Sequence, residues 1–347
     1  MIEPNRRLKL GITFNLKSDV TPRSGEPDDR YEEFDSEETI SSIEGALRYH
    51  GHDVIRLGWG APMLERIFEI RRSGGRLDGV FNLAEGVGGR GRESQVPACL
   101  EMLGIPFTGS DALTLALALD KSMAKRIASS HGIRTAPFRV VSALSELEHL
   151  DLAYPLFVKP ALEGSSMGIT DQSLCHDRAA IEERVPRMLS DYGPVLVEEF
   201  LPGDEFTVGI VGNGSEARVL GTMQVTPRKR NPAFVYSLEM KRNFRDLIEY
   251  IIPPAIDCRA LADVENLALD AFRVFGCRDV TRVDIRNDRE GRPSFIEMNP
   301  LPGMNPSSSD LIILSLGYGL SYEDVIGAVV GAAGKRWRET EVLRDSS

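Results

Sequence analysis

The sequence predicts an α/β protein of more than one domain, and three observations carry this prediction. Strand-like and helix-like segments alternate over residues 8–83, a mixed pattern begins near residue 154, and a strand hairpin covers residues 281–299. The alternation is typical of parallel strands that are joined by right-handed helical crossovers. A chain of 347 residues has enough material for two or three separate cores.

The first part of the chain reads as strand, helix, strand, helix, strand. Ser36 is a good helix N-cap, and Gly51 is a good residue to follow a helix end. The expected elements up to residue 141 are strands at 8–14, 53–57, 78–83 and 134–141, and helices at 36–50, 62–72, from about 94, and 113–130.

The second part reads as an α+β unit that leads into the hairpin. The expected strands are 156–159, 169–170, 195–200 and 205–211, and the expected helices are 179–189, 260–275 and one after residue 321. Segment 224–255 has no clear pattern. The charged residues beyond about Arg336 are expected to form a tail without regular structure.

The hairpin at 281–299 sorts its side chains onto two faces by strict alternation. One face is apolar and the other polar: Val283, Ile285, Ile296 and Met298 against Arg282, Asp284, Glu297 and Asn299. A turn centred near Glu290 places Asp284 opposite Glu297 and Arg282 opposite Asn299. Two facing carboxylates repel each other, so the pair requires a cation between them.

The ligands and the loop beside them indicate phosphate chemistry. Carboxylate oxygens and an amide oxygen suit magnesium better than zinc. Loop 300–305 (PLPGMN) follows directly and offers backbone N–H groups to an anion. The alternative reading is a surface hairpin with incidental charges, which does not explain the ordered placement of unlike polar groups.

Two further segments fit a nucleotide. Loop 163–168 (EGSSMG) is rich in small residues and follows Lys159, so its amides and the lysine can meet phosphate oxygens. Lys121 is a second candidate lysine, although a lone helical lysine is usually a surface residue. Segment 195–205 (VLVEEFLPGDE) ends a strand at Pro-Gly, which frees backbone groups for a base edge and a carboxylate for ribose.

Composition narrows the class of partners. A formal net charge of −11 argues against a nucleic-acid surface but does not exclude a local basic pocket for ATP. The apolar run at the start is too short for a signal peptide, and no stretch has the length of a membrane span. The four cysteines are scattered. We therefore expect reduced thiols, a cytoplasmic location, and neither nucleic-acid nor membrane partners.

The segments in this order resemble the D-alanine–D-alanine ligases of the ATP-grasp superfamily over residues 78–330. Seven segments carry the resemblance: VFNLAEG, GRESQVPACLEMLGIPFTGS, ALALDKSMAK, FVKPALEGSSMG, VLVEEFLPGDEFTVG, RVDIR and FIEMNPLPGMNPSSS. The resemblance implies a three-domain ATP-grasp fold with an N-terminal Rossmann-like (pre-ATP-grasp) domain. The expected divisions are residues 1–120, 121–200, 201–335 and a tail at 336–347.

The resemblance also implies a reaction and its cofactors. ATP phosphorylates the carboxylate of one amino acid, and the amine of a second displaces phosphate to form a peptide-type bond. The implied cofactors are ATP and two magnesium ions, with manganese as a substitute, and the implied assembly is a homodimer. In the family this reaction serves peptidoglycan synthesis.

Site residues carry over position by position from the family. The implied ATP contacts are Lys121, Lys159, Ser165, Ser166, Met167, Gly168, Glu198, Glu199, Phe200, Leu201 and Glu205. The implied metal ligands are Asp284, Glu297 and Asn299. Arg282 and the Gly303 amide would stabilise the tetrahedral oxyanion, Ser165 would join the catalytic network, and Lys241 would close the site from a mobile loop.

The amino-acid positions depart from the family pattern. Glu93 matches an acidic residue that supports the first substrate, and Ser308 matches the residue that binds the second carboxylate. Glu85 stands where the family has a histidine, and Arg242 where it has a tyrosine. We expect each new charge to pair within the protein or to meet a charged substrate. The alternatives are therefore a ligase with other amino-acid or amine substrates, and a nucleotide-binding regulatory protein without turnover.

Overall fold

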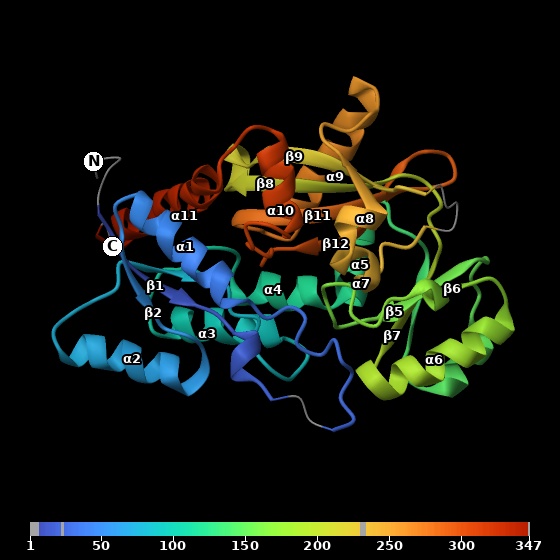
Figure 1. Ribbon diagram of the computed structural model, residues 1–347, viewed down its shortest axis with the longest axis horizontal. Coiled ribbons are helices and arrows are strands. Elements are labelled where there is room, and N and C mark those ends of the chain that lie inside the picture. Colours follow the sequence, from blue (N-terminus) through green and yellow to red (C-terminus); the bar gives the residue numbers. More distant parts are fainter. Residues whose placement is uncertain (1–6, 22–23, 230–233, 346–347) are drawn as a thin grey trace.

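The computed structural model describes residues 7–21, 24–229 and 234–345 and contains three β-sheets (Figure 1). The first sheet is parallel, in the order β2-β1-β3, as the βαβαβ pattern predicts. Its elements are β1 (Lys9–Thr13), α1 (Glu37–Tyr49), β2 (Asp53–Arg56), α2 (Gly60–Arg72) and β3 (Gly79–Asn82). Ser36 is the N-cap of α1, and its side chain accepts a hydrogen bond from the Thr39 amide at 3.2 Å.

The helix expected at 113–130 is two helices, and this correction positions a site residue. A short 3-10 turn, η2 (Arg92–Ser94), and α3 (Gln95–Met102) precede α4 (Ala112–Leu119) and α5 (Lys121–Ser130). Asp120 breaks the run because its extended backbone ends α4, while its carboxylate accepts from the amides of Ser122 and Met123 at 3.0 and 3.1 Å. The break places Lys121 at the first position of α5.

The second sheet is antiparallel, in the order β4-β7-β5-β6. Its elements are β4 (Phe138–Val141), β5 (Leu156–Pro160), β6 (Leu174–Cys175), α6 (Arg178–Tyr192) and β7 (Val195–Glu199). The strand expected at residues 169–170 is wrong, because the Thr170 amide bonds to the Ser173 hydroxyl and starts a 3-10 turn instead. The strand that pairs with β5 on the side away from β7 is β6, which begins four residues after Thr170.

The third sheet is also antiparallel, in the order β10-β9-β8-β11-β12. Its strands are β8 (Glu205–Gly212), β9 (Arg218–Pro227), β10 (Ile248–Ile251), β11 (Asp279–Asn287) and β12 (Pro293–Asn299). Its helices are α7 (Leu238–Arg242), α8 (Phe244–Leu247), α9 (Cys258–Val274) and α10 (Asp310–Gly317). The segment left without a pattern therefore contains the end of β9, two short helices and β10.

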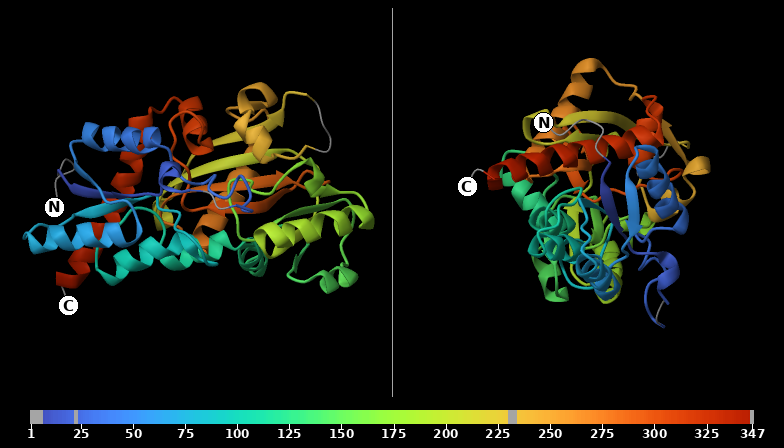
Figure 2. Two further views of the ribbon diagram at one scale, coloured as in Figure 1. Left: turned by 60° about the horizontal axis from the view of Figure 1, so that its bottom comes forward. Right: turned by 90° about the vertical axis from the view of Figure 1, so that its left-hand side faces the viewer.

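The cores follow these sheets. Helix α9 packs on one face of the third sheet, where Val264 and Phe272 share a buried cluster with Val283, Ile285 and Phe295. Helices α1 and α11 (Tyr322–Asp345) lie side by side over the first sheet and bury a second cluster (Figures 1 and 2). No single helix of the described chain is long and apolar enough to span a membrane, and one bent pair, α10 with α11, passes by length and composition only.

The chain beyond Arg336 is helical, so the expectation of an unstructured tail is wrong through residue 345. Residues 346–347 lie outside the described residues. Arg336 pairs with the buried carboxylate of Asp279 at 2.6 Å. Trp337 is 8% exposed, lies in the core of the first sheet, and donates from Nε1 to the Phe107 carbonyl at 3.2 Å. The charged composition of this segment predicted solvent exposure, whereas Trp337 is buried and Arg336 pairs with a buried carboxylate.

Replacing Trp337 with alanine should lower the free energy of unfolding by about 3 kcal/mol or more, because it leaves a cavity beside β3. Its ring lies so close to Gly79 that a β-carbon there would meet it at 2.4 Å. Urea unfolding monitored by circular dichroism measures the change. Trp337→Phe should lose less, and a loss under about 1 kcal/mol for the alanine variant would contradict the packing.

Candidate active site

The hairpin β11–β12 has the predicted register at its polar end. Arg282 lies opposite Asn299, and Asp284 lies opposite Glu297. The register then shifts, and Ile285 pairs with Phe295. Ile296 was expected on the core face, but the bulge turns it toward the pocket while Phe295 takes the core position.

The predicted metal ligands lie together and are held by cations. Lys121 Nζ is 3.1 Å from Glu297 Oε2, and Arg282 Nη2 is 3.0 Å from Asp284 Oδ2. Asn299 donates from Nδ2 to Asp284 Oδ2 at 3.3 Å, so its side-chain amide lies against this carboxylate. Two carboxylates and an amide oxygen form a donor set that fits magnesium.

The two facing carboxylates differ in their pKa values. Burial raises the pKa of Asp284, with Arg282 opposing and Glu297 adding to the shift. Burial alone would also raise the pKa of Glu297, but Lys121, Lys159, Lys241 and Arg282 lower it to about 2. Glu297 is therefore ionised at neutral pH and attracts a cation from the pocket side.

A pocket opens between the second and third sheets. It encloses about 650 Å³ of empty space, including its mouth. Its apolar walls come from β5, β7, the segment before α7, and β12, and include Phe157, Phe200, Leu201, Val235 and Ile296. An apolar slot with polar groups at its ends is the usual form of a nucleotide-base site.

Most residues predicted to contact ATP line this pocket. They are Lys159, Ser166, Glu198, Glu199, Phe200, Leu201 and Glu205, together with the predicted catalytic Lys241. Lys121 lies beside them through its pair with Glu297. Ser165, Met167 and Gly168 are not among the lining residues.

Loop 163–168 forms a tight turn beside the pocket. Ser165 and Ser166 both have left-handed backbones, with φ of 46° and 58°. The Ser166 hydroxyl donates to the Tyr236 carbonyl at 3.2 Å, while Met167 is buried beneath the turn. Gly168 donates its amide to Asp29 at 2.8 Å, which ties the loop to the N-terminal part of the chain.

A triad of buried charges lies at the wall of the pocket, and sequence reasoning missed one member of it, Lys125. Glu198 forms ion pairs with Lys125 and Lys159 through its two oxygens, each at 2.7 Å. Burial raises the pKa of Glu198, but the two ammonium groups overcome burial and lower it to about 2. Lys125 stands four residues after Lys121 on α5, so helical spacing was the one signal available for it. Two lysines on one carboxylate leave a net positive charge for an anion.

Arg282 is shared between two carboxylates. It pairs with Asp284 and, at 3.3 Å through Nη1, with Asp310 at the start of α10. Asp310 also accepts from the hydroxyls of Tyr236 and Tyr250 at 3.3 and 3.4 Å. Sequence reasoning missed Asp310 because an acidic residue in the first turn of a helix usually needs no tertiary partner.

The loop after β12 carries the two other predicted contacts. Gly303 lies so near Ser309 that a β-carbon would meet its hydroxyl at 2.9 Å. Ser308 is exposed and donates to Asn305 Oδ1 at 2.9 Å. Both stand on the short connection between β12 and α10.

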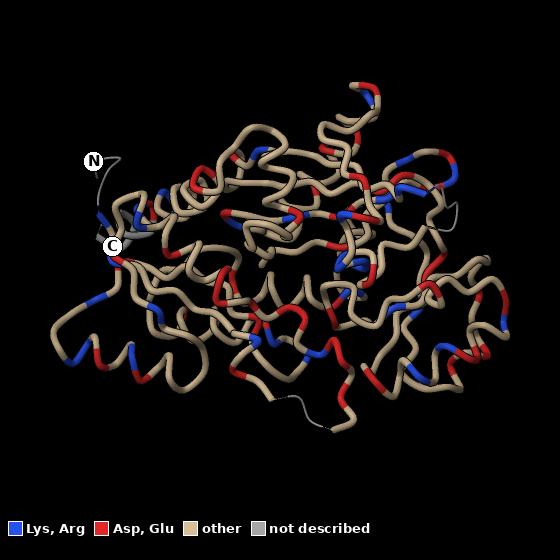
Figure 3. Tube along the Cα trace, viewed as in Figure 1, with Lys and Arg blue, Asp and Glu red and all other residues tan. Residues whose placement is uncertain are grey.

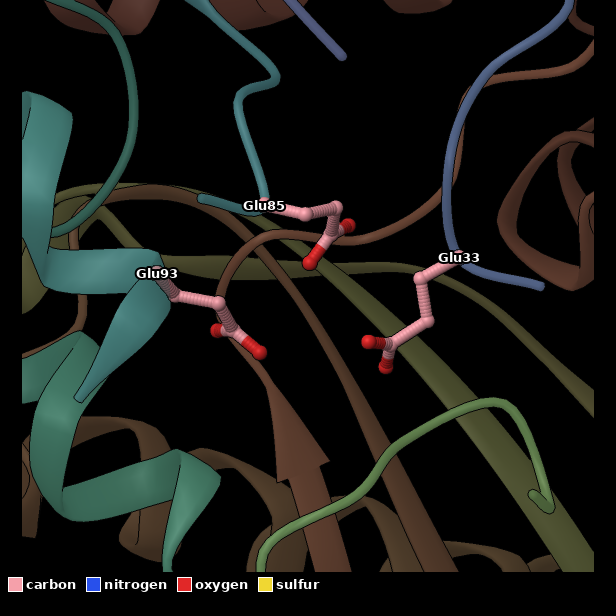
Figure 4. A group of neighbouring side chains, drawn as sticks. All are labelled: Glu33, Glu85 and Glu93. Atoms are coloured by element: carbon pink, nitrogen blue, oxygen red, sulfur yellow. The ribbon is translucent and has the colours of Figure 1, made fainter. Parts of the chain in front are cut away.

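The two departures from the family pattern have different surroundings. Arg242 is half-exposed and pairs with Glu32 at 2.7 Å, so this cation is neutralised within the protein. Glu85 lies with Glu93 and Glu33, with oxygens from the three side chains within 4.8 Å of one another (Figure 4). Two neighbouring acidic residues before α1 thus meet the two departures separately: Glu32 pairs with Arg242, and Glu33 lies in the cluster with Glu85.

Figure 3 shows lysine and arginine close to aspartate and glutamate through the middle of the molecule. Two antiparallel sheets that close on a pocket with buried lysines and facing carboxylates define an ATP-grasp protein. The family model described as "D-ala D-ala ligase C-terminus" matches residues 127–331, so the chain belongs to the D-alanine–D-alanine ligase family.

Relatives agree with this assignment. A D-alanine–D-alanine ligase of Cupriavidus metallidurans is 36% identical over 339 residues, which cover 96% of this chain and 94% of that protein. The ATP complex of a D-alanine–D-alanine ligase from Bacillus anthracis has a TM-score of 0.70 at 19% identity, covering 96% of this chain and 99% of that one. VanG D-Ala:D-Ser ligase from Enterococcus faecalis has a TM-score of 0.71 at 22% identity, covering 94% and 100%. The two structures show the fold.

The stability that Glu198 contributes should be lost in acid. A carboxylate with a lowered pKa contributes stability that is present above its ordinary value of 4.5 and is lost as the pH falls toward 2. Glu198→Gln should cost about 3 kcal/mol at pH 7, and its difference from the wild type should narrow below pH 4.5. Urea unfolding across pH measures both quantities. The exposed Glu65→Gln is the control, and a pH-independent difference would contradict the triad.

Proposed function

We propose that the chain is an ATP-dependent carboxylate–amine ligase that joins two amino acids. ATP would phosphorylate the carboxylate of the first, and the amine of the second would displace phosphate from the acyl phosphate. The observation that carries the proposal is the meeting of Asp284, Glu297 and Arg282 with the lysine-lined pocket. Membership of the D-alanine–D-alanine ligase family supports the same reaction.

The proposed role of each residue follows from its charge. Lys121 and Lys159 would hold phosphate oxygens, and the left-handed turn at Ser165 and Ser166 would cover them. Glu198 to Leu201 would meet the base, and Glu205 the ribose. Both lysines pair with carboxylates, Lys121 with Glu297 and Lys159 with Glu198, so phosphate oxygens would compete with these carboxylates for the ammonium groups.

Magnesium would be held by Asp284, Glu297 and Asn299, and it would screen the phosphates from these carboxylates. Arg282 would then stabilise the charge that develops on the tetrahedral intermediate, together with the Gly303 amide. Asp310 and the two tyrosines bonded to it fix the other edge of this guanidinium. Two magnesium ions, replaceable by manganese, a homodimeric assembly and a cytoplasmic location extend the proposal by resemblance to the family.

Wild-type protein should release phosphate from ATP only when amino acids are present, and Asp284→Asn should abolish nearly all of this release. Removing one carboxylate weakens the binding of the metal ion that would lie between the phosphates and Glu297. A coupled phosphate assay over D- and L-amino acids at saturating magnesium measures it, with circular dichroism as the folding control. Phosphate release that no amino acid stimulates would leave a nucleotide-binding regulatory protein.

Arg282→Lys should lower turnover roughly a hundredfold while the affinity for ATP changes little. Lysine keeps the charge but loses the planar fork that reaches two acceptors, and the charge it opposes exists only in the transition state. Steady-state kinetics and nucleotide titration separate the two quantities. A loss confined to nucleotide affinity would instead assign Arg282 to the ATP site.

A further inference from the structure

Three glutamates converge from separate segments beside the proposed reaction centre. Glu33 comes from the loop before α1, Glu85 follows β3, and Glu93 lies in η2. Figure 4 shows the three carboxylates pointing toward one another. Lys121 links the cluster to the proposed metal ligands: its ammonium group lies 3.1 Å from Glu297 and donates to the carbonyl of Glu163. The carboxylate of Glu163 lies 3.7 Å from Arg92, which pairs with Glu33 of the cluster.

The cluster carries more negative charge than the protein neutralises. Arg92 pairs with Glu33 and lies 3.7 Å from Glu163, which Arg30 also meets at 3.3 Å. Within the described residues, neither the carboxylate of Glu85 nor that of Glu93 has a hydrogen bond or an ion pair; Glu93 is 8% exposed and Glu85 is partly exposed. With Arg92 and Arg30 set against Glu33 and Glu163, two carboxylates are left over.

Leaving these two carboxylates without partners is costly in the folded protein. Burial raises the pKa of Glu85 well above its ordinary value, and Glu33 and Glu93 raise it further. Burial and Glu33 likewise raise the pKa of Glu93 to about 8. A buried carboxylate either takes up a proton or meets a cation. An arrangement that aims two of them at one point is therefore suited to a cationic ligand.

The geometry accommodates an ammonium group. The oxygens of the three side chains lie within 4.8 Å of one another, so a central atom can lie within about 2.8 Å of each of them. This range includes the length of N–H···O hydrogen bonds. Arg92 beside the cluster opposes a doubly charged metal ion more strongly than a singly charged ammonium group.

We propose that the amino acid bound against Glu33, Glu85 and Glu93 is a diamino acid, whose α-ammonium and side-chain ammonium groups meet the two carboxylates that the protein leaves unpaired. The inference rests on the proposed ligase function and names the class of one of its substrates. The carboxylate of such a substrate would point away from the cluster, toward Lys121 and the metal ligands. Its two positive charges match the two carboxylates that are left over, whereas a single ammonium group would balance only one of them.

The test compares matched amino acids as first substrates. 2,3-Diaminopropionate is compared with 2-aminobutyrate, and 2,4-diaminobutyrate with norvaline, in both D and L forms and with a fixed panel of second amino acids. Phosphate release gives kcat/KM, and fragmentation mass spectrometry of the dipeptide identifies the residue that donated its carboxyl group. We expect at least a tenfold preference for a diamino acid at that position.

Glu85→Gln tests whether the cluster causes the preference. In this variant the ratio of kcat/KM for the diamino acid to kcat/KM for its neutral counterpart should fall at least tenfold. Glu65→Gln, an exposed residue on α2, is the matched control and should leave the ratio unchanged. Replacing an unpaired carboxylate should not destabilise the fold, which thermal unfolding checks, and Glu93→Gln serves as the second variant.

The outcomes separate the inference from the proposed function. Equal or better turnover with neutral amino acids, unchanged in Glu85→Gln, would overturn the inference and leave the ligase. Phosphate release with no amino acid would overturn the proposed function, and calorimetric binding of 2,4-diaminobutyrate to wild type and Glu85→Gln would then decide the inference alone. Binding of magnesium or calcium without nucleotide, lost in Glu85→Gln, would overturn it in favour of a metal site.

Discussion

Two carboxylates that face each other across β11 and β12 impose the constraint on which the site depends. Asp284 and Glu297 repel each other, so the ladder at this point is stable only if cations reach both. Lys121 and Arg282 supply them. The break at Asp120 starts a new helix at Lys121 and so places the cation that Glu297 needs, although helix and hairpin are far apart in the sequence.

The same pairing of cations with carboxylates repeats at the wall of the pocket, where Lys125 and Lys159 share Glu198. Pairing offsets part of the desolvation cost of these buried charges. In the proposed reaction, phosphates would compete with carboxylates for the lysines, and a metal ion would lower the cost of displacing Lys121 from Glu297.

Local patterns predicted the parts of the fold that depend on near neighbours. Turn chemistry near Glu290 and the alternation on either side gave the register of Asp284 with Glu297, because both signals act within a few residues. The bulge at Ile296 interrupts that alternation and could not be seen from the period alone. Trp337 was misjudged for a similar reason. Its charged neighbours indicate solvent, and only the packing against β3 shows that its side chain is buried.

The residues of the candidate site likewise fall into those that local patterns predict and those that they do not. Lys159, Asp284 and Glu297 could be found because each stands in a short motif with its own chemistry. Lys125, Asp310 and Glu33 could not, because their partners lie 73, 28 and 59 residues away and no local pattern marks them. The resemblance to a family located positions, but it did not reveal that Arg242 is neutralised by Glu32 while Glu85 is left unpaired.

Positive and negative side chains are concentrated at opposite ends of the site. The phosphate side is rich in lysine and arginine, and the side beyond Glu93 carries more carboxylates than cations. In the proposed reaction, an amino acid between them would be oriented by its own dipole, with its carboxylate toward the cations and its ammonium toward the glutamates. This orientation would present the carboxylate to the γ-phosphate and keep the amine away from it. The acidic cluster would thus orient the first substrate as well as select it.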